Sequence, residues 1–113
     1  MHALVIEDEF LIALQLAEWL YDKGFITVDV AVTEDAAVAH AHARRPDIIT
    51  ADYNLLMGTG VGALKRISDH FDVPVVFVTS VPERVRASYP DAVIISKPFN
   101  LDDFTRAIEA ALA

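Results

Sequence analysis

Short apolar runs and longer amphipathic segments alternate along the whole chain. Each apolar run is rich in β-branched residues and lies between turn signals, a pattern typical of buried strands. The segments between the runs have helical spacing of their apolar residues or helix-capping residues at their starts. The expected strands are residues 4–6, 27–32, 47–52, 74–80 and 92–95. The expected helices are residues 10–22, 34–44 and 61–70, a short one between Pro82 and Pro90, and one after Asn100.

Local capping signals agree with these boundaries. Gly24 follows the first helix, in the position that a C-terminal cap prefers. Thr33 and Asn100 are typical N-caps, and each precedes acidic residues that suit the positive end of the helix dipole. Strand and helix alternate five times, which predicts an α/β fold with a parallel sheet, helices on both faces and right-handed crossovers.

Composition narrows the class of protein. A chain of 113 residues, 54% of them hydrophobic, is expected to form one domain with a substantial core. The formal net charge of −8, from 17 acidic and 9 basic residues, argues against a nucleic-acid partner. The absence of cysteine excludes disulfides and thiol chemistry. The apolar runs are too short to span a membrane and the N-terminus lacks a targeting pattern, so we expect a cytoplasmic protein with no membrane partner.

Polar residues gather where the expected strands end. In a parallel α/β sheet, ligands bind outside the carboxyl ends of the strands. The candidate residues at these ends are Glu7 and Asp8 after the first strand, Asp52 after the third, Thr79 after the fourth, and Lys97 after the fifth. We therefore expect three carboxylates, a hydroxyl and an ammonium to lie along one edge of the sheet.

These residue types predict a particular chemistry. Two like charges about 4 Å apart repel by roughly 4 kcal/mol at an effective dielectric near 20, so three carboxylates need a counter-charge. A hard divalent cation with oxygen ligands, such as Mg²⁺, is the natural one. Lys97 supplies a second positive charge, and Thr79 supplies a hydroxyl donor. Together they are suited to phosphoryl transfer onto a carboxylate, with charge stabilisation carrying the catalysis.

The same residues resemble the two-component response-regulator receiver domain. The resemblance rests on Glu7-Asp8, Asp52 followed two residues later by Asn54, Thr79, and Lys97-Pro98-Phe99, and it covers essentially the whole chain. It implies the flavodoxin-like receiver fold, with five helices around a five-stranded parallel sheet in the order 2-1-3-4-5. That order places the first and third strands side by side, where the acidic residues meet.

The resemblance also implies a role for each motif residue. Asp52 would accept the phosphoryl group from a phosphohistidine, carried by a sensor histidine kinase or a histidine phosphotransfer protein. Asp8, Asp52 and the backbone carbonyl of Asn54 would hold Mg²⁺, with Glu7 binding through water. Lys97 would contact Asp52 and the phosphoryl group, and Thr79 would move toward the acyl phosphate on activation.

The chain departs from the family pattern at three places, and the first of them concerns the switch. The family usually carries Tyr or Phe three residues before the Lys, where Ile94 stands. Leu56 occupies a loop position that is usually Pro. The stretch between Thr79 and Lys97 is shorter than usual, which predicts a small or mobile fourth helix. The segment Phe77–Val81 partly matches a receiver subgroup that also lacks the switch aromatic.

Several polar residues receive structural interpretations. Glu9 is expected to act as a favourable charge in the first turn of the first helix, and Ser80 as a helix cap. His40 and His42 are two residues apart on a helix and face different sides, which argues against a shared metal. His70 is expected at a helix end.

Two further groups are interpreted from spacing and exposure. Gly58, Gly60 and Gly62 lack the Lys-Ser/Thr of a phosphate loop and are expected to give freedom to a mobile loop. Leu11 and Leu14 lie on a helix with more apolar surface than one buried stripe needs. They are either ordinary surface leucines or a docking patch for a partner helix, such as the kinase's histidine-bearing bundle.

The expected function is a phosphorylation-switched receiver of a two-component phosphorelay, acting on a downstream protein partner. It would catalyse only its own phosphorylation at Asp52 and slow dephosphorylation, and is not otherwise an enzyme. One alternative is a receiver-like interaction module that does not respond to phosphorylation, which Ile94 favours. The other is an Asp-nucleophile phosphohydrolase, which 113 residues leave little room for.

Overall fold

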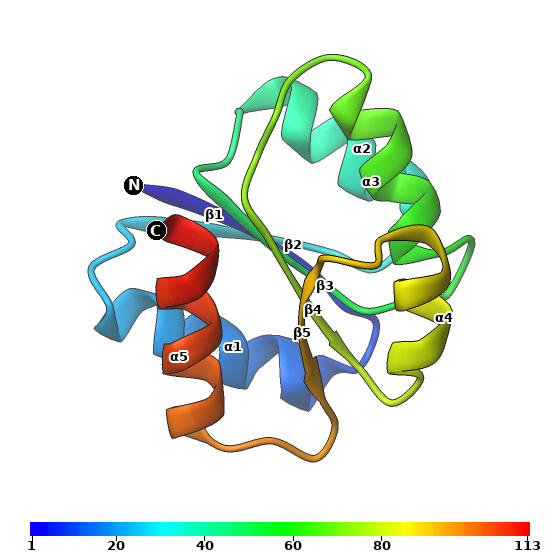
Figure 1. The fold of residues 1–113 in the computed structure, drawn as a ribbon. Coiled ribbons are helices and arrows are strands. Elements are labelled where there is room, and N and C mark those ends of the chain that lie inside the picture. The colour runs from blue at the N-terminus through cyan, green and yellow to red at the C-terminus, as the bar shows by residue number, and fades with distance from the viewer.

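Five parallel strands form one sheet in the order β2-β1-β3-β4-β5 (Figure 1), and this confirms the expected fold class. The structure is a computed structural model that describes residues 1–113. The strands are β1 (His2–Ile6), β2 (Thr27–Ala31), β3 (Ile48–Ala51), β4 (Val75–Thr79) and β5 (Val93–Ser96). The helices are α1 (Phe10–Asp22), α2 (Glu34–Ala43), α3 (Gly60–Ser68), α4 (Pro82–Ser88) and α5 (Leu101–Leu112).

The helices form two layers, one on each face of the sheet. Helices α1 and α5 cover one face, and α2, α3 and α4 cover the other (Figure 1). Successive strand residues point to opposite faces, so Leu4 and Ile6 pack on the α2–α3–α4 side while Ala3 and Val5 pack on the α1–α5 side. Because both faces of the sheet are covered, β1 is buried along its whole length.

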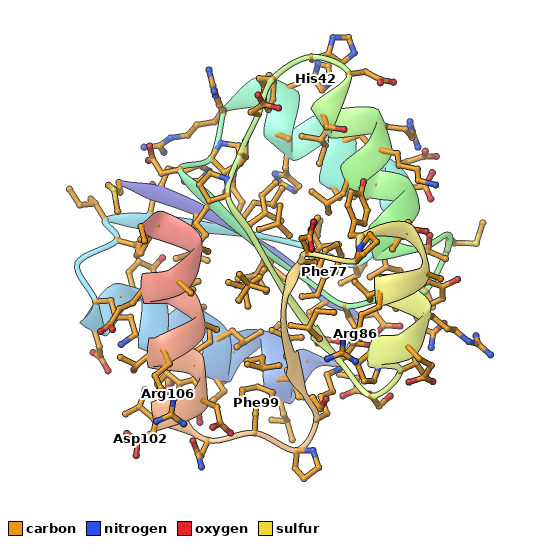
Figure 2. The ribbon with its side chains drawn as sticks, viewed as in Figure 1. His42, Phe77, Arg86, Phe99, Asp102 and Arg106 are labelled. Atoms are coloured by element: carbon orange, nitrogen blue, oxygen red, sulfur yellow. The ribbon has the colours of Figure 1, made fainter.

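The side chains drawn in Figure 2 show which residues lie in the core and which at the surface. Phe77 lies in the core on the α4 side of the sheet, whereas Arg86, Asp102 and Arg106 lie at the outer surface (Figure 2). None of the helices has the length and apolar character that a membrane span requires.

The capping residues act as predicted at three helix ends. The side-chain oxygen of Thr33 accepts a hydrogen bond from the Ala36 N–H, and that of Asn100 accepts one from the Asp103 N–H. Gly24 follows α1 with a φ of +99°, in the left-handed region that favours glycine. Helix α4 has only 7 residues, which agrees with the small fourth helix expected from the short spacing.

Two sequence-based predictions are wrong: that Ser80 caps a helix, and that Gly60 and Gly62 belong to a loop. Ser80 does not cap α4, because the N-cap position is Val81 and no side chain makes a capping hydrogen bond to this helix. Gly60 and Gly62 do not belong to a loop, because they lie in the first turn of α3. Gly60 is needed for close packing, since a Cβ there would collide with the carbonyl oxygen of Asp52.

Candidate functional site

Strand pairing brings the predicted site residues to one edge of the sheet. Ile6 of β1 is paired with Ala51 of β3, and the Asp52 N–H continues the ladder by donating to the Ile6 carbonyl at 2.9 Å. The Lys97 N–H donates to the Thr79 carbonyl at 2.9 Å, which aligns the ends of β4 and β5. The strand ends therefore meet as the alternation of strand and helix predicted.

Three acidic side chains converge at this edge. One carboxylate oxygen from each of Glu7, Asp8 and Asp52 lies within 4.8 Å of the other two. Glu7 and Asp52 are buried, with 1% and 7% of their surface exposed, whereas Asp8 is exposed. The acidic group is thus buried at Glu7 and Asp52 and open to solvent at Asp8.

Lys97 is the cation that this acidic group shares. Its Nζ lies 2.7 Å from Oδ2 of Asp52 and 2.9 Å from Oε1 of Glu7. Burial alone would lower the pKa of Lys97, but hydrogen bonds to Asp52 and Glu7 and their negative charges outweigh it, so the net shift is upward. Lys97 therefore carries its positive charge at neutral pH.

Glu7 has the most perturbed electrostatics in the site. Burial raises its pKa to about 7, against the opposing effects of the Lys97 ammonium and the Glu9 N–H. Its Oε1 lies close to Lys97 but lacks a well-directed hydrogen-bond donor. A buried carboxylate oxygen without such a donor can accept a further cation or an ordered water.

The backbone also contributes a donor to the site. The N–H of Tyr53 donates to Oδ1 of Asp52 at 2.6 Å, so the two Asp52 oxygens have different partners. Thr79 is fully buried, and its hydroxyl is close enough to the β4–α4 turn to accept the Val81 N–H. The remaining predicted residue, Asn54, is exposed and pairs through its backbone with Thr59 in an isolated antiparallel bridge.

The donor set fits a hard divalent cation. The ligands that the group offers are all carboxylate oxygens, one from each of Glu7, Asp8 and Asp52. Such oxygens, together with water, are the ligands that Mg²⁺ prefers. The buried Oε1 of Glu7, which has no well-directed donor, is an acceptor suited to a metal-bound water. The residues present are therefore compatible with Mg²⁺.

Two contacts at the site were missed by the sequence interpretation. Glu9 is the N-cap residue of α1 but makes no side-chain cap bond, and its Oε2 lies 3.5 Å from Lys97 Nζ. The interpretation of Glu9 as a first-turn helix charge is thus incomplete; its position next to Glu7-Asp8 was the available signal. The guanidinium of Arg84 lies 5.8 Å from the ring of Tyr53, which links α4 to the residue after Asp52, and no sequence signal indicated this contact.

Leu11 and Leu14 line different grooves beside the site. Leu11 is 80% exposed and lines a groove of about 750 Å³ together with Trp19, Lys97 and Phe99. Leu14 is 47% exposed and lines a groove of about 310 Å³ between α1 and β2. Each leucine therefore contributes exposed apolar surface on α1, Leu11 beside Lys97 and Leu14 beside Glu7 and Asp8.

Comparison with known proteins identifies the family. The family model of the response regulator receiver domain matches residues 3–109. The chain belongs to this receiver domain family, and the resemblance drawn from the motif residues is confirmed. Residues 3–109 include all the predicted site residues, from Glu7 to Lys97.

The most informative relatives are regulators. The chain is 38% identical over 113 residues to the phyllosphere-induced regulator PhyR of Methylorubrum extorquens, covering 96% of this chain and 42% of PhyR. It is 32% identical to the transcriptional regulatory protein PdtaR of Mycobacterium tuberculosis, covering 97% of this chain and 56% of PdtaR. The chain thus spans about half the length of these curated relatives.

Solved structures agree. The solution structure of the Erythrobacter litoralis PhyR receiver domain has a TM-score of 0.90 and 32% identity, covering 98% of this chain and 88% of that one. PhyR from Brucella abortus gives a TM-score of 0.88 and 32% identity, covering 98% of this chain and 47% of that one. A further PhyR structure, from Bartonella quintana, is described as an anti-anti-sigma factor.

Proposed function

We propose that residues 1–113 form a single receiver domain in which Asp52 is the phosphoacceptor. The observation that carries the proposal is the sharing of Lys97 between Asp52 and Glu7 at the meeting point of β1, β3 and β5. Both carboxylates are buried and held in place before any phosphoryl donor arrives. Such pre-organised charge favours phosphoryl transfer, in which positioning and electrostatic stabilisation carry the catalysis.

The transfer step follows from this arrangement. A carboxylate oxygen of Asp52 attacks the phosphorus of a phosphohistidine, the P–N bond breaks, and the departing imidazole nitrogen takes up a proton. Lys97 shifts its contact from the Asp52 carboxylate toward the phosphoryl oxygens, and the Thr79 hydroxyl donates to one of them. Attack by water on the phosphorus later releases inorganic phosphate and restores the carboxylate. The protein is in this sense a slow self-hydrolase and not a catalyst for other substrates.

Mg²⁺ would be held by Asp8, Asp52 and the backbone carbonyl of Asn54, with Glu7 binding through water. When bound, the metal neutralises negative charge on the phosphoryl oxygens. Glu7 and Asp8 balance the charge of that cation, while Lys97 remains available to the phosphoryl group. The site combines several carboxylates with one ammonium because the carboxylates offset the charge of the metal and the ammonium binds the phosphoryl group.

The proposed partners are proteins. The donor would be a sensor histidine kinase or a histidine phosphotransfer protein in the cytoplasm. Its histidine-bearing helix would rest in the groove that contains Leu11 and Phe99, because this groove reaches Lys97. A downstream protein would read the phosphorylated state, since the net charge of −8 disfavours nucleic acid. The Bartonella PhyR is described as an anti-anti-sigma factor. A protein that regulates a sigma factor is therefore one candidate for the downstream partner.

Phosphorylation from a small donor tests the proposal directly. The protein is incubated with acetyl phosphate and Mg²⁺ and examined by intact mass spectrometry, and we expect one acid-labile phosphoryl group per chain. The label should be absent in Asp52→Asn and when Mg²⁺ is removed by a chelator. Persistence of the same label in Asp52→Asn would contradict the assignment.

A phosphorylation-insensitive interaction module is the second candidate. It is favoured by Ile94, which is half-buried and paired with Phe77 at the position where the family usually has an aromatic switch residue. The aromatic neighbour of Phe77 is instead Tyr89, with ring centroids 5.7 Å apart. Amide chemical shifts with Mg²⁺ and then beryllofluoride distinguish the candidates. A response limited to the Mg²⁺ effect would favour the module.

A further inference from the structure

Glu34, the first residue of α2, holds the loop that follows Asp52. Residues 52–59 connect β3 to α3 and include Asn54. The backbone N–H of Glu34 donates to the Met57 carbonyl at 2.9 Å, and the Leu56 N–H donates to the Val32 carbonyl at 3.2 Å. The loop is thereby attached to the end of β2, although 25 residues separate Glu34 from Thr59 in the sequence.

The side chain of Glu34 adds contacts at the far end of the same loop. Its Oε1 accepts the Thr59 N–H at 3.3 Å, and its Oε2 accepts a hydrogen bond from Nη1 of Arg66 in α3 at 3.0 Å. The Glu34 side chain is 25% exposed, so this ion pair is partly shielded from solvent. One carboxylate therefore binds both the last residue of the loop and the helix that follows it.

Two glycines leave the space that Glu34 occupies. A Cβ on Gly58 would lie 2.6 Å from the Cβ of Glu34, and Gly58 also has a φ of +83°. A Cβ on Gly62 would collide with Oε1 of Glu34. Gly58 and Gly62, which were expected to give freedom to a mobile loop, thus line the space that one side chain fills.

The loop is also fixed at its beginning, close to the phosphoacceptor. The Gly60 N–H donates to the Tyr53 carbonyl at 2.8 Å, and Gly60 packs directly against the Asp52 carbonyl. Between these points Asn54 lies opposite Thr59 in an isolated antiparallel bridge, which the Gly60–Tyr53 hydrogen bond closes. Glu34 accepts the N–H of Thr59 and so holds the residue that faces the Asn54 backbone.

We propose that Glu34 is a positioning residue for the metal site, holding the Asn54 carbonyl in place through Thr59. The inference rests on the proposed function, in which that carbonyl is an Mg²⁺ ligand. Groups that orient metal ligands from outside the ligand set commonly change metal affinity by 10- to 100-fold when removed. Glu34 lies on α2, outside the motif residues that define the acidic site.

The chain offers a matched control in the neighbouring acid. Asp35 also pairs with Arg66, at 2.7 Å, but its side chain is 90% exposed. Glu34→Ala removes the contact with Thr59 and one ion pair, whereas Asp35→Ala removes only an ion pair with the same arginine. Mg²⁺ affinity is measured without any phosphoryl donor, from the amide chemical shifts of the full chain, and then from the Mg²⁺ dependence of phosphorylation by acetyl phosphate.

We expect Glu34→Ala to weaken Mg²⁺ binding by roughly tenfold. The phosphorylation rate at saturating Mg²⁺ should stay near that of the unmodified chain, because Asp52 and Lys97 are untouched. Asp35→Ala should bind Mg²⁺ like the unmodified chain. Glu34→Gln should bind within about twofold of it, because the amide oxygen still accepts the Thr59 N–H. A purely structural role of Glu34 would lower the melting temperature of Glu34→Ala. It would not raise the Mg²⁺ concentration at half-saturation while leaving the phosphorylation rate at saturating Mg²⁺ unchanged.

Gly62→Ala provides a second variant should Glu34→Ala fail to fold. The added methyl group displaces the Glu34 carboxylate without removing it, and the same loss of Mg²⁺ affinity is expected. The inference is overturned if Glu34→Ala reaches half-saturation at the same Mg²⁺ concentration as Asp35→Ala. Where Gly62→Ala takes the place of Glu34→Ala, the same comparison applies. Absence of phosphorylation in the unmodified chain instead overturns the proposed function, and the Mg²⁺ titration distinguishes the two failures.

Discussion

The Lys97 ammonium lies 2.7 Å from Oδ2 of Asp52 and 2.9 Å from Oε1 of Glu7. Lys97 is 45 positions from Asp52 in the sequence, and Glu7 lies near the N-terminus. The two carboxylates are buried, so each depends on this cation to offset its desolvation. The same ammonium lies 3.5 Å from the more exposed Glu9. Lys97 is therefore both a structural counter-ion and the candidate ligand of a phosphoryl group.

Removal of Lys97 should destabilise the fold. In Lys97→Ala, Glu7 and Asp52 remain buried without a cation, and an unpaired buried charge commonly costs about 3 kcal/mol. We expect a loss of that order in urea unfolding at neutral pH without Mg²⁺, and partial recovery when Mg²⁺ supplies the missing charge. Lys23→Ala is the control, because Lys23 is exposed, donates one hydrogen bond to the Thr105 hydroxyl and should cost little. Equal losses in the two variants would contradict this role of Lys97.

The raised pKa of Glu7 predicts a pH-dependent stability. Burial raises this pKa from 4.5 to about 7, so the folded state favours the protonated acid. The associated stability is fully present below pH 4.5 and is lost as the pH rises through about 7. Relative to Glu7→Gln, the unmodified chain should lose on the order of 1–2 kcal/mol between about pH 5 and pH 8 without Mg²⁺. A difference between the two proteins that stays constant with pH would exclude this titration.

Mg²⁺ binding should release protons near neutral pH. The metal favours ionised Glu7, whose pKa of about 7 leaves it partly protonated under these conditions. Calorimetric titrations of Mg²⁺ in buffers of different ionisation enthalpy measure the protons released. We expect a fraction of one proton at pH 7 and a smaller value at pH 8. Glu7→Gln should abolish this dependence on the buffer.

Gly60→Ala should disturb both stability and the site. A Cβ at this position meets the backbone carbonyl of Asp52, which cannot move without shifting β3. We expect a loss of about 2–3 kcal/mol in urea unfolding together with weaker Mg²⁺ binding. Gly24→Ala is the comparison, because nothing lies within 4 Å and only its φ of +99° opposes the change. Gly24→Ala should cost about 1 kcal/mol and leave Mg²⁺ binding intact.

Thr79 should stabilise the start of α4 through its hydroxyl. Thr79→Val keeps the shape but removes the acceptor of the Val81 N–H, at a cost of about 1 kcal/mol. Hydrogen exchange of the Val81 amide should become faster in Thr79→Val and stay slow in Thr79→Ser, which retains the hydroxyl. If Val81 exchanges equally in both variants, the hydrogen bond does not protect this turn.

The strands and the strand-end residues could be predicted because their signals are local. The β-branched runs, the caps at Thr33 and Asn100 and the glycine after α1 depend on residues a few positions away. The acidic residues follow directly after strands, so parallel pairing alone places them at one edge. The sequence signal for Glu9 beside Lys97, its position next to Glu7-Asp8, did not decide its role, because a first-turn acid has an equally good local explanation.

The sequence alone thus determined the order and type of the elements, the family and the residues that end each strand. Only the tertiary structure decided how these residues share their contacts. Lys97 is divided among Glu7, Glu9 and Asp52, and Glu34 reaches across from α2 to hold the loop after β3. Such contacts join positions far apart in the chain, and their distances depend on strand order and register, which no local pattern of side chains encodes.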